Sequence, residues 1–180
     1  MKAALIPVSA ALALYAGAAI LPIGAFDQAE AQRARGPSWA TRNYVMKAGA
    51  GDLYEIRSSE LAARRARQPA IREFAQMLIR DHRRTTAEVT AAARADGVPV
   101  RAPVLEPAQR NMIRQLERAR PAMFDRLYLN QQVGAHSQAL ALHRGYARSG
   151  DARALRRVAN NAVPVIQGHL AHARRLQRRR

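Results

Sequence analysis

Residues 69–95 carry the clearest helical pattern of the chain: PAIREFAQMLIRDHRRTTAEVTAAARA. Within this stretch, small, apolar and weakly polar residues recur in alternating steps of four and three: Ile71, Ala75, Leu78, His82, Thr85, Val89 and Ala92. Such spacing is typical of the buried seam of a helix that packs against near-parallel neighbours. Pro69 suits the first turn of a helix, and Gly97 suits the position just after its end. The stretch therefore predicts one long helix of a helical bundle.

Four further helices are predicted on either side of this stretch. A second seam in four-three steps runs through Leu155, Ala159, Ala162, Ile166, His169, Ala173 and Leu176. Prolines and a Ser-Gly-Asp turn separate the helical segments, because these residues interrupt or terminate helices. The predicted additional helices cover about 43–66, 107–119, 121–148 and 152–176, with Asn43 and Asp151 as candidate N-caps.

The long connection between the two helical pairs predicts the topology. About 25 residues separate the helix that ends near Ala95 from the one that begins at Pro121. Ten extended residues reach about 30 Å, and thirteen helical ones add about 20 Å, against about 39 Å for a 26-residue helix. The connection can therefore cross the whole bundle. Two helical hairpins joined by a long crossover that contains a short helix form a ferritin-like arrangement, so we expect an all-α, ferritin-like four-helix bundle.

The N-terminal segment has the features of an export signal. Lys2 precedes an uncharged stretch, residues 3–26, and Ala29-Glu30-Ala31 has the small-x-small pattern that signal peptidase recognises. An alternative is an uncleaved anchor in the inner membrane, since 24 uncharged residues suffice to span a bilayer. We expect a periplasmic or otherwise exported protein. Its predicted parts are a signal peptide (1–31), a flexible tether (32–42), the helical domain (43–177) and a basic tail (178–180).

The chain is strongly basic and contains no cysteine. Its net charge is +17, and removal of residues 1–31 raises the charge to +18 because Lys2, Asp27 and Glu30 are lost. A field of this sign favours anionic partners. In an exported protein we expect these to be lipid head groups, cell-wall polymers or acidic proteins. Nucleic acid is not expected because no recognisable nucleic-acid-binding module is present. The alternative is a compositional bias toward alanine and arginine with no bearing on partners.

Several blocks of sequence together resemble a known family. The blocks are AGAGDLYE at residues 48–55, FAQMLIRDH at 74–82, VGAH at 133–136 and PVIQGHL at 164–170. This pattern is similar to that of domain of unknown function (DUF) family 4142, over about residues 43–177. The resemblance implies a ferritin-like four-helix fold in an exported bacterial protein, and it implies no biochemical role.

Four polar residues are candidate metal ligands: Glu55, His82, His136 and His169. One comes from each predicted long helix, and each lies at or near a buried position. Imidazole and carboxylate groups bind borderline transition metals, so copper, zinc, iron or manganese are the candidate ions. Counted from the predicted turns, the first three share one level along the bundle, whereas His169 falls about 9 Å too far along. The alternative is a structural polar core in which Glu55 satisfies the buried histidines.

The sequence lacks the motifs of the common enzymes with this fold. A di-iron oxidase needs a Glu-x-x-His motif on each of two helices, and no glutamate here has a histidine three residues later. A phosphate-binding glycine loop and a nucleophile elbow are also missing. We therefore expect an exported binding protein rather than an enzyme, with a role in metal binding or envelope stress. The alternative function is an arginine-rich interaction protein that docks onto anionic envelope components, with purely structural histidines.

Overall fold

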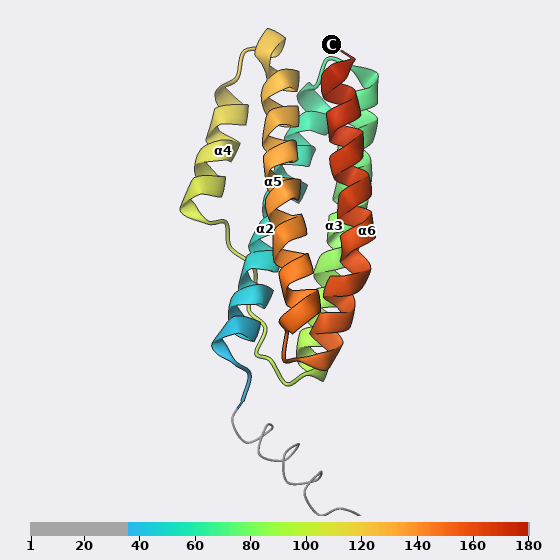
Figure 1. Cartoon of the computed structure of the whole chain (residues 1–180). Coiled ribbons are helices and arrows are strands. Elements are labelled where there is room, and N and C mark those ends of the chain that lie inside the picture. Colours follow the sequence, from blue (N-terminus) through green and yellow to red (C-terminus); the bar gives the residue numbers. More distant parts are fainter. Residues whose placement is uncertain (1–35, 180) are drawn as a thin grey trace, which may run out of the picture. The chain divides into compact units, whose positions relative to one another are not determined.

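The computed structural model describes residues 36–179, which form five α-helices and no strand (Figure 1). The helices are α2 (Trp39–Arg65), α3 (Pro69–Ala95), α4 (Pro107–Arg118), α5 (Pro121–Ser149) and α6 (Arg153–Arg178). The predicted all-α class is thus confirmed for these residues, and α3 has the predicted bounds. The predictions that concern residues 1–31, including the anchor at 3–26, lie outside the described part of the chain.

Helix α2 begins four residues earlier than predicted, at Trp39 instead of Asn43. The reason is a stronger N-cap: the side chain of Ser38 accepts a hydrogen bond from the backbone N–H of Thr41, at 3.0 Å. The last four residues of the predicted tether are therefore helical.

Two aspartates join the two helical hairpins at their ends. Asp96, just after α3, accepts hydrogen bonds from the backbone N–H groups of Ala154 (3.0 Å) and Leu155 (2.8 Å) in the first turn of α6. Asp125, in α5, accepts from the N–H groups of the turn between α2 and α3, Arg67 (3.0 Å) and Gln68 (3.2 Å). The prediction that Asp151 caps α6 is wrong, because Asp96 reaches those N–H groups from the other hairpin, while Asp151 accepts from the hydroxyl of Thr41.

The four long helices lie side by side, with α2 against α3 and α5, and α6 against α5 and α3. The connection from α3 to α5 runs along the bundle, and its helix α4 packs on α2 and α5 (Figure 1). The α2–α3 turn and the α5–α6 turn consequently lie at opposite ends (Figure 1). Within residues 36–179, none of the helices is long and apolar enough to cross a membrane.

The core has two apolar clusters with a polar layer between them. One cluster lies near the α2–α3 turn and includes Ile71, Phe74 and Leu129. The other lies near the α5–α6 turn and includes Val89 and Leu155. Between these clusters each long helix contributes buried polar side chains, among them Asp52, Glu55, Ser58, His82, Gln132, His136 and His169. This layer contains the candidate site.

Candidate metal centre

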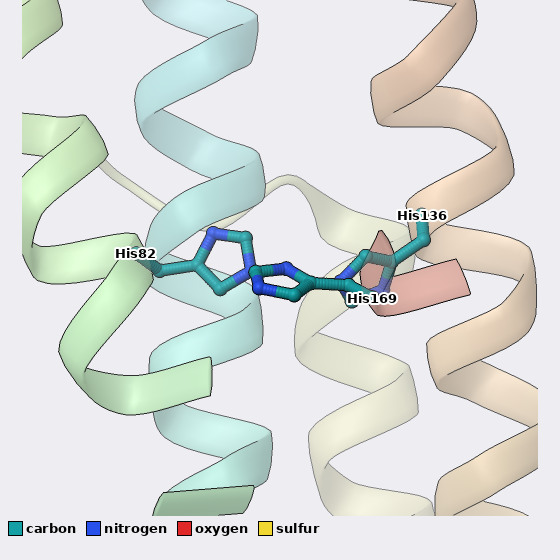
Figure 2. A group of neighbouring side chains, drawn as sticks. All are labelled: His82, His136 and His169. Carbon is teal, nitrogen blue, oxygen red and sulfur yellow. The ribbon is translucent and has the colours of Figure 1, made fainter. Parts of the chain in front are cut away.

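Three histidines from three different helices meet in the polar layer. His82 comes from α3, His136 from α5 and His169 from α6, and their rings point toward one another (Figure 2). The ring centroids are 5.6 Å apart for His82 and His136, 5.5 Å for His82 and His169, and 5.3 Å for His136 and His169. One nitrogen from each ring lies within 4.8 Å of one nitrogen from each of the others. All three side chains are buried, and their nitrogens lie close enough together that they could hold one metal ion.

Each ring is oriented by a hydrogen bond from one of its two nitrogens. His82 Nδ1 lies 2.8 Å from Asp52 Oδ1, and His169 Nε2 lies 2.9 Å from Asp81 Oδ2. His136 Nδ1 lies 2.9 Å from the backbone oxygen of Gln132, one turn earlier on α5. Metal-binding histidines commonly donate one N–H to a carboxylate or carbonyl in this way, because the bond selects the tautomer and the ring orientation.

The opposite nitrogen of each ring has no hydrogen-bond partner. These atoms are His82 Nε2, His136 Nε2 and His169 Nδ1, and all three are buried. A buried polar atom without a partner normally costs about 1–3 kcal/mol. The nitrogens His136 Nε2 and His169 Nδ1, each on a ring already held by its other nitrogen, are of the donor type that transition metal ions accept.

Glu55 lies beside the three histidines and contacts two of them. Its Oε2 is 2.7 Å from His82 Nε2, at ion-pair distance but without hydrogen-bond alignment, and its Oε1 is 3.1 Å from His136 Nδ1. Glu55 groups with Asp52 and His82 as a second set of potential ligands. The two sets share His82. Thr86 donates to the second oxygen of Asp52, at 2.9 Å, and so holds that carboxylate in place.

The electrostatics of the layer separate the three histidines into one cation and two neutral rings. Burial alone would lower the pKa of His82, but the charges of Glu55 and Asp52 raise it to about 10. Burial lowers the pKa of His169 to about 4 and also lowers that of His136. Burial would raise the pKa of Glu55, but the neighbouring imidazoles of His136 and His82 lower it to about 2. At neutral pH two imidazoles therefore carry free lone pairs.

A family model described as "Domain of unknown function (DUF4142)" matches residues 26–176 of the chain. The chain belongs to the DUF4142 family. This confirms the resemblance deduced from the sequence blocks, and every residue of the polar layer lies within the matched range. No significant match was found among curated proteins or among solved structures.

In this DUF4142 protein His169 lies closer to His136 along the bundle axis than the sequence predicted. His136 lies 13 residues before the end of α5, and His169 lies 16 residues after the start of α6, so their backbones differ by about 4.5 Å along the axis instead of about 9 Å. The Cα–Cβ bonds of a helix tilt toward its N-terminus. On these antiparallel helices His136 therefore leans away from the α5–α6 turn and His169 leans toward it, which closes the remaining gap.

Sequence reasoning missed the two aspartates of the candidate site, Asp52 and Asp81. Both could have been found from their positions: Asp81 directly precedes His82, and Asp52 is three residues before Glu55, on the same face of α2. The remaining histidines are outside the trio. His143 is buried and pairs with the hydroxyl of Tyr44 at 3.2 Å, while half-buried His172 contacts the ring of Phe74.

Proposed function

We propose that this DUF4142 protein is an exported metal-binding protein that holds one divalent transition metal ion between His82, His136 and His169. The observation that supports the proposal is the convergence of three buried imidazoles whose rings are held from behind by Asp52, Asp81 and the Gln132 carbonyl, with the nitrogens His136 Nε2 and His169 Nδ1 left unpartnered. A metal ion would supply the partner that these two nitrogens lack, and it would bind His82 Nε2 in place of the proton that now faces Glu55.

The donor set favours certain ions. Imidazole suits zinc, copper and iron, whereas manganese prefers oxygen ligands. Zinc–nitrogen bonds in tetrahedral sites are about 2.0–2.1 Å long, so the ligand nitrogens around one ion lie about 3.4 Å apart. The three nitrogens fall within 4.8 Å of one another, so the rings would have to move closer together on binding an ion. We therefore favour zinc or copper, with Glu55 as an adjacent carboxylate that a bound ion would attract.

A purely structural polar core accounts for only part of the layer. It accounts for His82, whose charge is balanced by Asp52 and Glu55. It leaves His136 Nε2 and His169 Nδ1 without a partner. Metal binding gives a partner to these two nitrogens and is for this reason the function that we favour.

We also propose that the helices form a ferritin-like four-helix bundle and that the protein is exported. The pairing of α2 with α3 and of α5 with α6, together with the long crossover through α4, supports a ferritin-like four-helix arrangement. The lone uncharged N-terminal stretch, residues 3–26, supports export to the periplasm or attachment to the inner membrane.

Elemental analysis tests the proposed metal centre. The mature protein, purified from an exported preparation without affinity tags or chelators, should contain about one zinc or copper ion per chain. The variant His82→Ala should lose the ion and keep its helicity. The matched control is His172→Ala, because His172 lies on α6 outside the trio. Unchanged metal content in His82→Ala, or no metal in the unmodified protein even after addition of zinc and copper, would reject the proposal.

A second candidate function rests on the distribution of exposed arginines. Many of them gather at the end of the bundle where α2, α4 and α6 finish (Figure 1): Arg64, Arg67, Arg118, Arg120, Arg174, Arg175, Arg178 and Arg179. We propose that this end docks onto anionic lipid head groups, since clustered basic residues are attracted to such surfaces. Binding to vesicles of anionic phospholipid should fall steeply with salt.

Charge variants locate this surface. Replacement of Arg174, Arg175 and Arg178 by glutamine should weaken vesicle binding at least tenfold. Replacement of Arg148, Arg153 and Arg157, three exposed arginines at the opposite end, should have a much smaller effect. Binding that is insensitive to salt, or equally weakened by both triple variants, would reject this second candidate.

A further inference from the structure

A cavity of about 750 Å³ lies between α2, α4 and α5. Its outer wall includes the exposed residues Lys47, Glu106 and Gln138, so the cavity is accessible from solvent. Its lining contains none of the three histidines of the trio. Its inner charged groups are the buried carboxylates of Asp52 and Glu55. The charge that the cavity presents to a ligand at its inner wall is therefore negative.

We propose that this cavity binds a small organic amine, with the ammonium group at the inner wall beside Asp52 and Glu55 and the apolar body against the rest of the wall. This inference goes beyond the proposed metal-binding function and does not rest on it, because it needs no ion at the histidines. It is carried by the charge balance of the inner wall, by the acceptor atoms there, and by the size and lining of the cavity.

Two buried carboxylates at the inner wall share one cationic partner. Asp52 Oδ1 lies 2.8 Å from His82 Nδ1, and Glu55 Oε2 lies 2.7 Å from His82 Nε2. Within residues 36–179, no lysine or arginine lies at ion-pair distance from either carboxylate. One negative charge is therefore left without a cation, and a buried charge without a partner is costly. A cationic ligand would balance it.

One oxygen of Glu55 lacks a hydrogen-bond donor. Glu55 is only 2% exposed and lines the cavity, and its Oε1 has no hydrogen-bond partner in the described part of the chain. The nearby His136 Nδ1, 3.1 Å away, donates instead to the backbone oxygen of Gln132. A second proton on His136 would sit on Nε2, which has no acceptor, so this ring does not supply the missing charge either.

Asp52 has acceptor capacity left for a ligand. Its Oδ1 pairs with His82 Nδ1 at 2.8 Å, and its Oδ2 accepts from the hydroxyl of Thr86 at 2.9 Å. An ionised carboxylate offers about four lone-pair sites, and an ammonium group has three N–H donors. The ammonium group can therefore donate to Asp52 at the inner wall. Because Oε1 of Glu55 is itself buried, a second contact there requires a rotation of the Glu55 side chain.

The size and lining of the cavity favour an organic ligand. Binding sites for small organic molecules measure about 300–1,000 Å³, whereas a water molecule occupies about 30 Å³. Apolar side chains cover much of the wall: Ala48, Met112, Ala135, Ala139 and Leu142. They suit an apolar ring or a short hydrocarbon chain, so the ligand is an amine with an apolar body and not a bare inorganic cation.

Two glycines keep the cavity wide. Gly51 lies within α2 and Gly134 within α5, and both line the cavity. Glycine inside a helix is destabilising relative to alanine. A Cβ atom added at either position would meet no atom within 4 Å, so packing of the helices does not require glycine there. Open space in the cavity is the consequence that both glycines share.

The inner wall alone selects the charge of the ligand. At the outer wall the charges of Lys47 and Glu106 oppose each other. The chain as a whole carries a net charge of +17, and this long-range field disfavours a cation. Salt screens the field of exposed charges but acts much less on a buried pair. Added salt should therefore not weaken binding of the amine.

Calorimetric titration with benzylamine tests this proposal. At neutral pH, the chelator-treated mature protein should bind benzylamine at least tenfold more tightly than neutral benzyl alcohol or anionic benzoate. The variant Asp52→Asn should bind benzylamine at least tenfold more weakly, because His82 then balances the one remaining carboxylate. The matched control is Asp96→Asn, which removes the same charge at the end of the bundle and should bind as the unmodified protein does.

A second pair of variants tests the location without changing a charge. Gly134→Leu, which fills part of the cavity, should abolish benzylamine binding. Its matched control is Gly168→Leu, because Gly168 is also an exposed helical glycine with free space around it but lies on α6, away from the cavity. Circular dichroism shows whether each variant is folded, and Gly134→Leu decides the location if Asp52→Asn is not.

The outcomes separate this proposal from the metal-binding function. No binding of benzylamine, or equal affinity for benzyl alcohol, overturns the ligand class. Unchanged binding in Gly134→Leu, equal losses in Asp52→Asn and Asp96→Asn, or an affinity that falls steeply with salt overturns the location. All titrations use metal-free protein, so each of these results leaves the proposed metal centre standing. Failure of the protein to retain zinc or copper likewise leaves the amine site standing.

Discussion

His169 Nε2 lies 2.9 Å from Oδ2 of Asp81, the residue that directly precedes His82. Two consecutive residues of α3 therefore have different roles at the candidate site. His82 contributes its ring to the trio, and Asp81 orients the ring of His169 on α6. Successive side chains of an α-helix point about 100° apart. Because α3 packs against both α2 and α6, His82 can contact Glu55 of α2 while Asp81 contacts α6.

The variant Asp81→Ala should weaken zinc or copper affinity by about 10- to 100-fold, because carboxylates that orient metal-binding histidines have effects of this size. Competition with a chromophoric chelator measures the affinity. Glu88→Ala is the matched control, since Glu88 is an exposed acidic residue of the same helix. An equal loss in both variants would show that only the charge of α3 matters.

The variant His136→Leu should abolish binding of the ion and should raise the unfolding free energy of the metal-free protein by about 1 kcal/mol. Its Nε2 is buried without a partner, and an apolar group of similar size removes that cost of about 1–3 kcal/mol, less the lost contacts of Nδ1 with the Gln132 carbonyl and with Glu55. Urea unfolding in a chelating buffer measures the change. If His136 is instead part of a structural polar core, the substitution should lower the unfolding free energy of the metal-free protein. A clear loss of stability would therefore contradict the metal-centre interpretation.

The stability of the metal-free protein should depend on pH through His82. Its pKa is about 10 in the folded protein and 6.5 in the unfolded chain. The folded protein binds the His82 proton more tightly than the unfolded chain does. The stabilisation that results is fully present below pH 6.5 and is lost as the pH rises through 10. The unfolding free energy should therefore fall between pH 6.5 and 10 more steeply in the unmodified protein than in His82→Gln. Parallel pH profiles for the two proteins would show that His82 is not held as a cation.

The variant Asp96→Ala should lower the unfolding free energy by about 1–2 kcal/mol, because it removes the acceptor of two N–H groups at the start of α6. Thermal unfolding followed by circular dichroism measures the loss. Asp96→Asn should retain part of the stability, since an amide oxygen still accepts a hydrogen bond. The metal content should be unchanged in both variants because Asp96 lies at the end of the bundle, away from the polar layer.

Local sequence determined the helices and the residues that face the interior. The four-three seams of α3 and α6 placed His82 and His169 on buried faces, and prolines marked the starts of α3, α4 and α5 to the residue. These features depend on interactions between residues a few positions apart, which the sequence displays directly. At the start of α2 the sequence analysis predicted Asn43 as the cap, whereas the structure has the cap at Ser38.

The tertiary structure alone decided how the polar groups of different helices pair. The match of Asp81 with His169 and of Asp52 with His82 depends on the relative rotation and level of packed helices. The meeting of His136 with His169 depends on the opposite tilt of side chains on antiparallel helices. The cavity beside Glu55 depends on how closely α2, α4 and α5 approach. Periodicity shows which face of a helix is buried, but the packing of whole helices sets which buried groups meet.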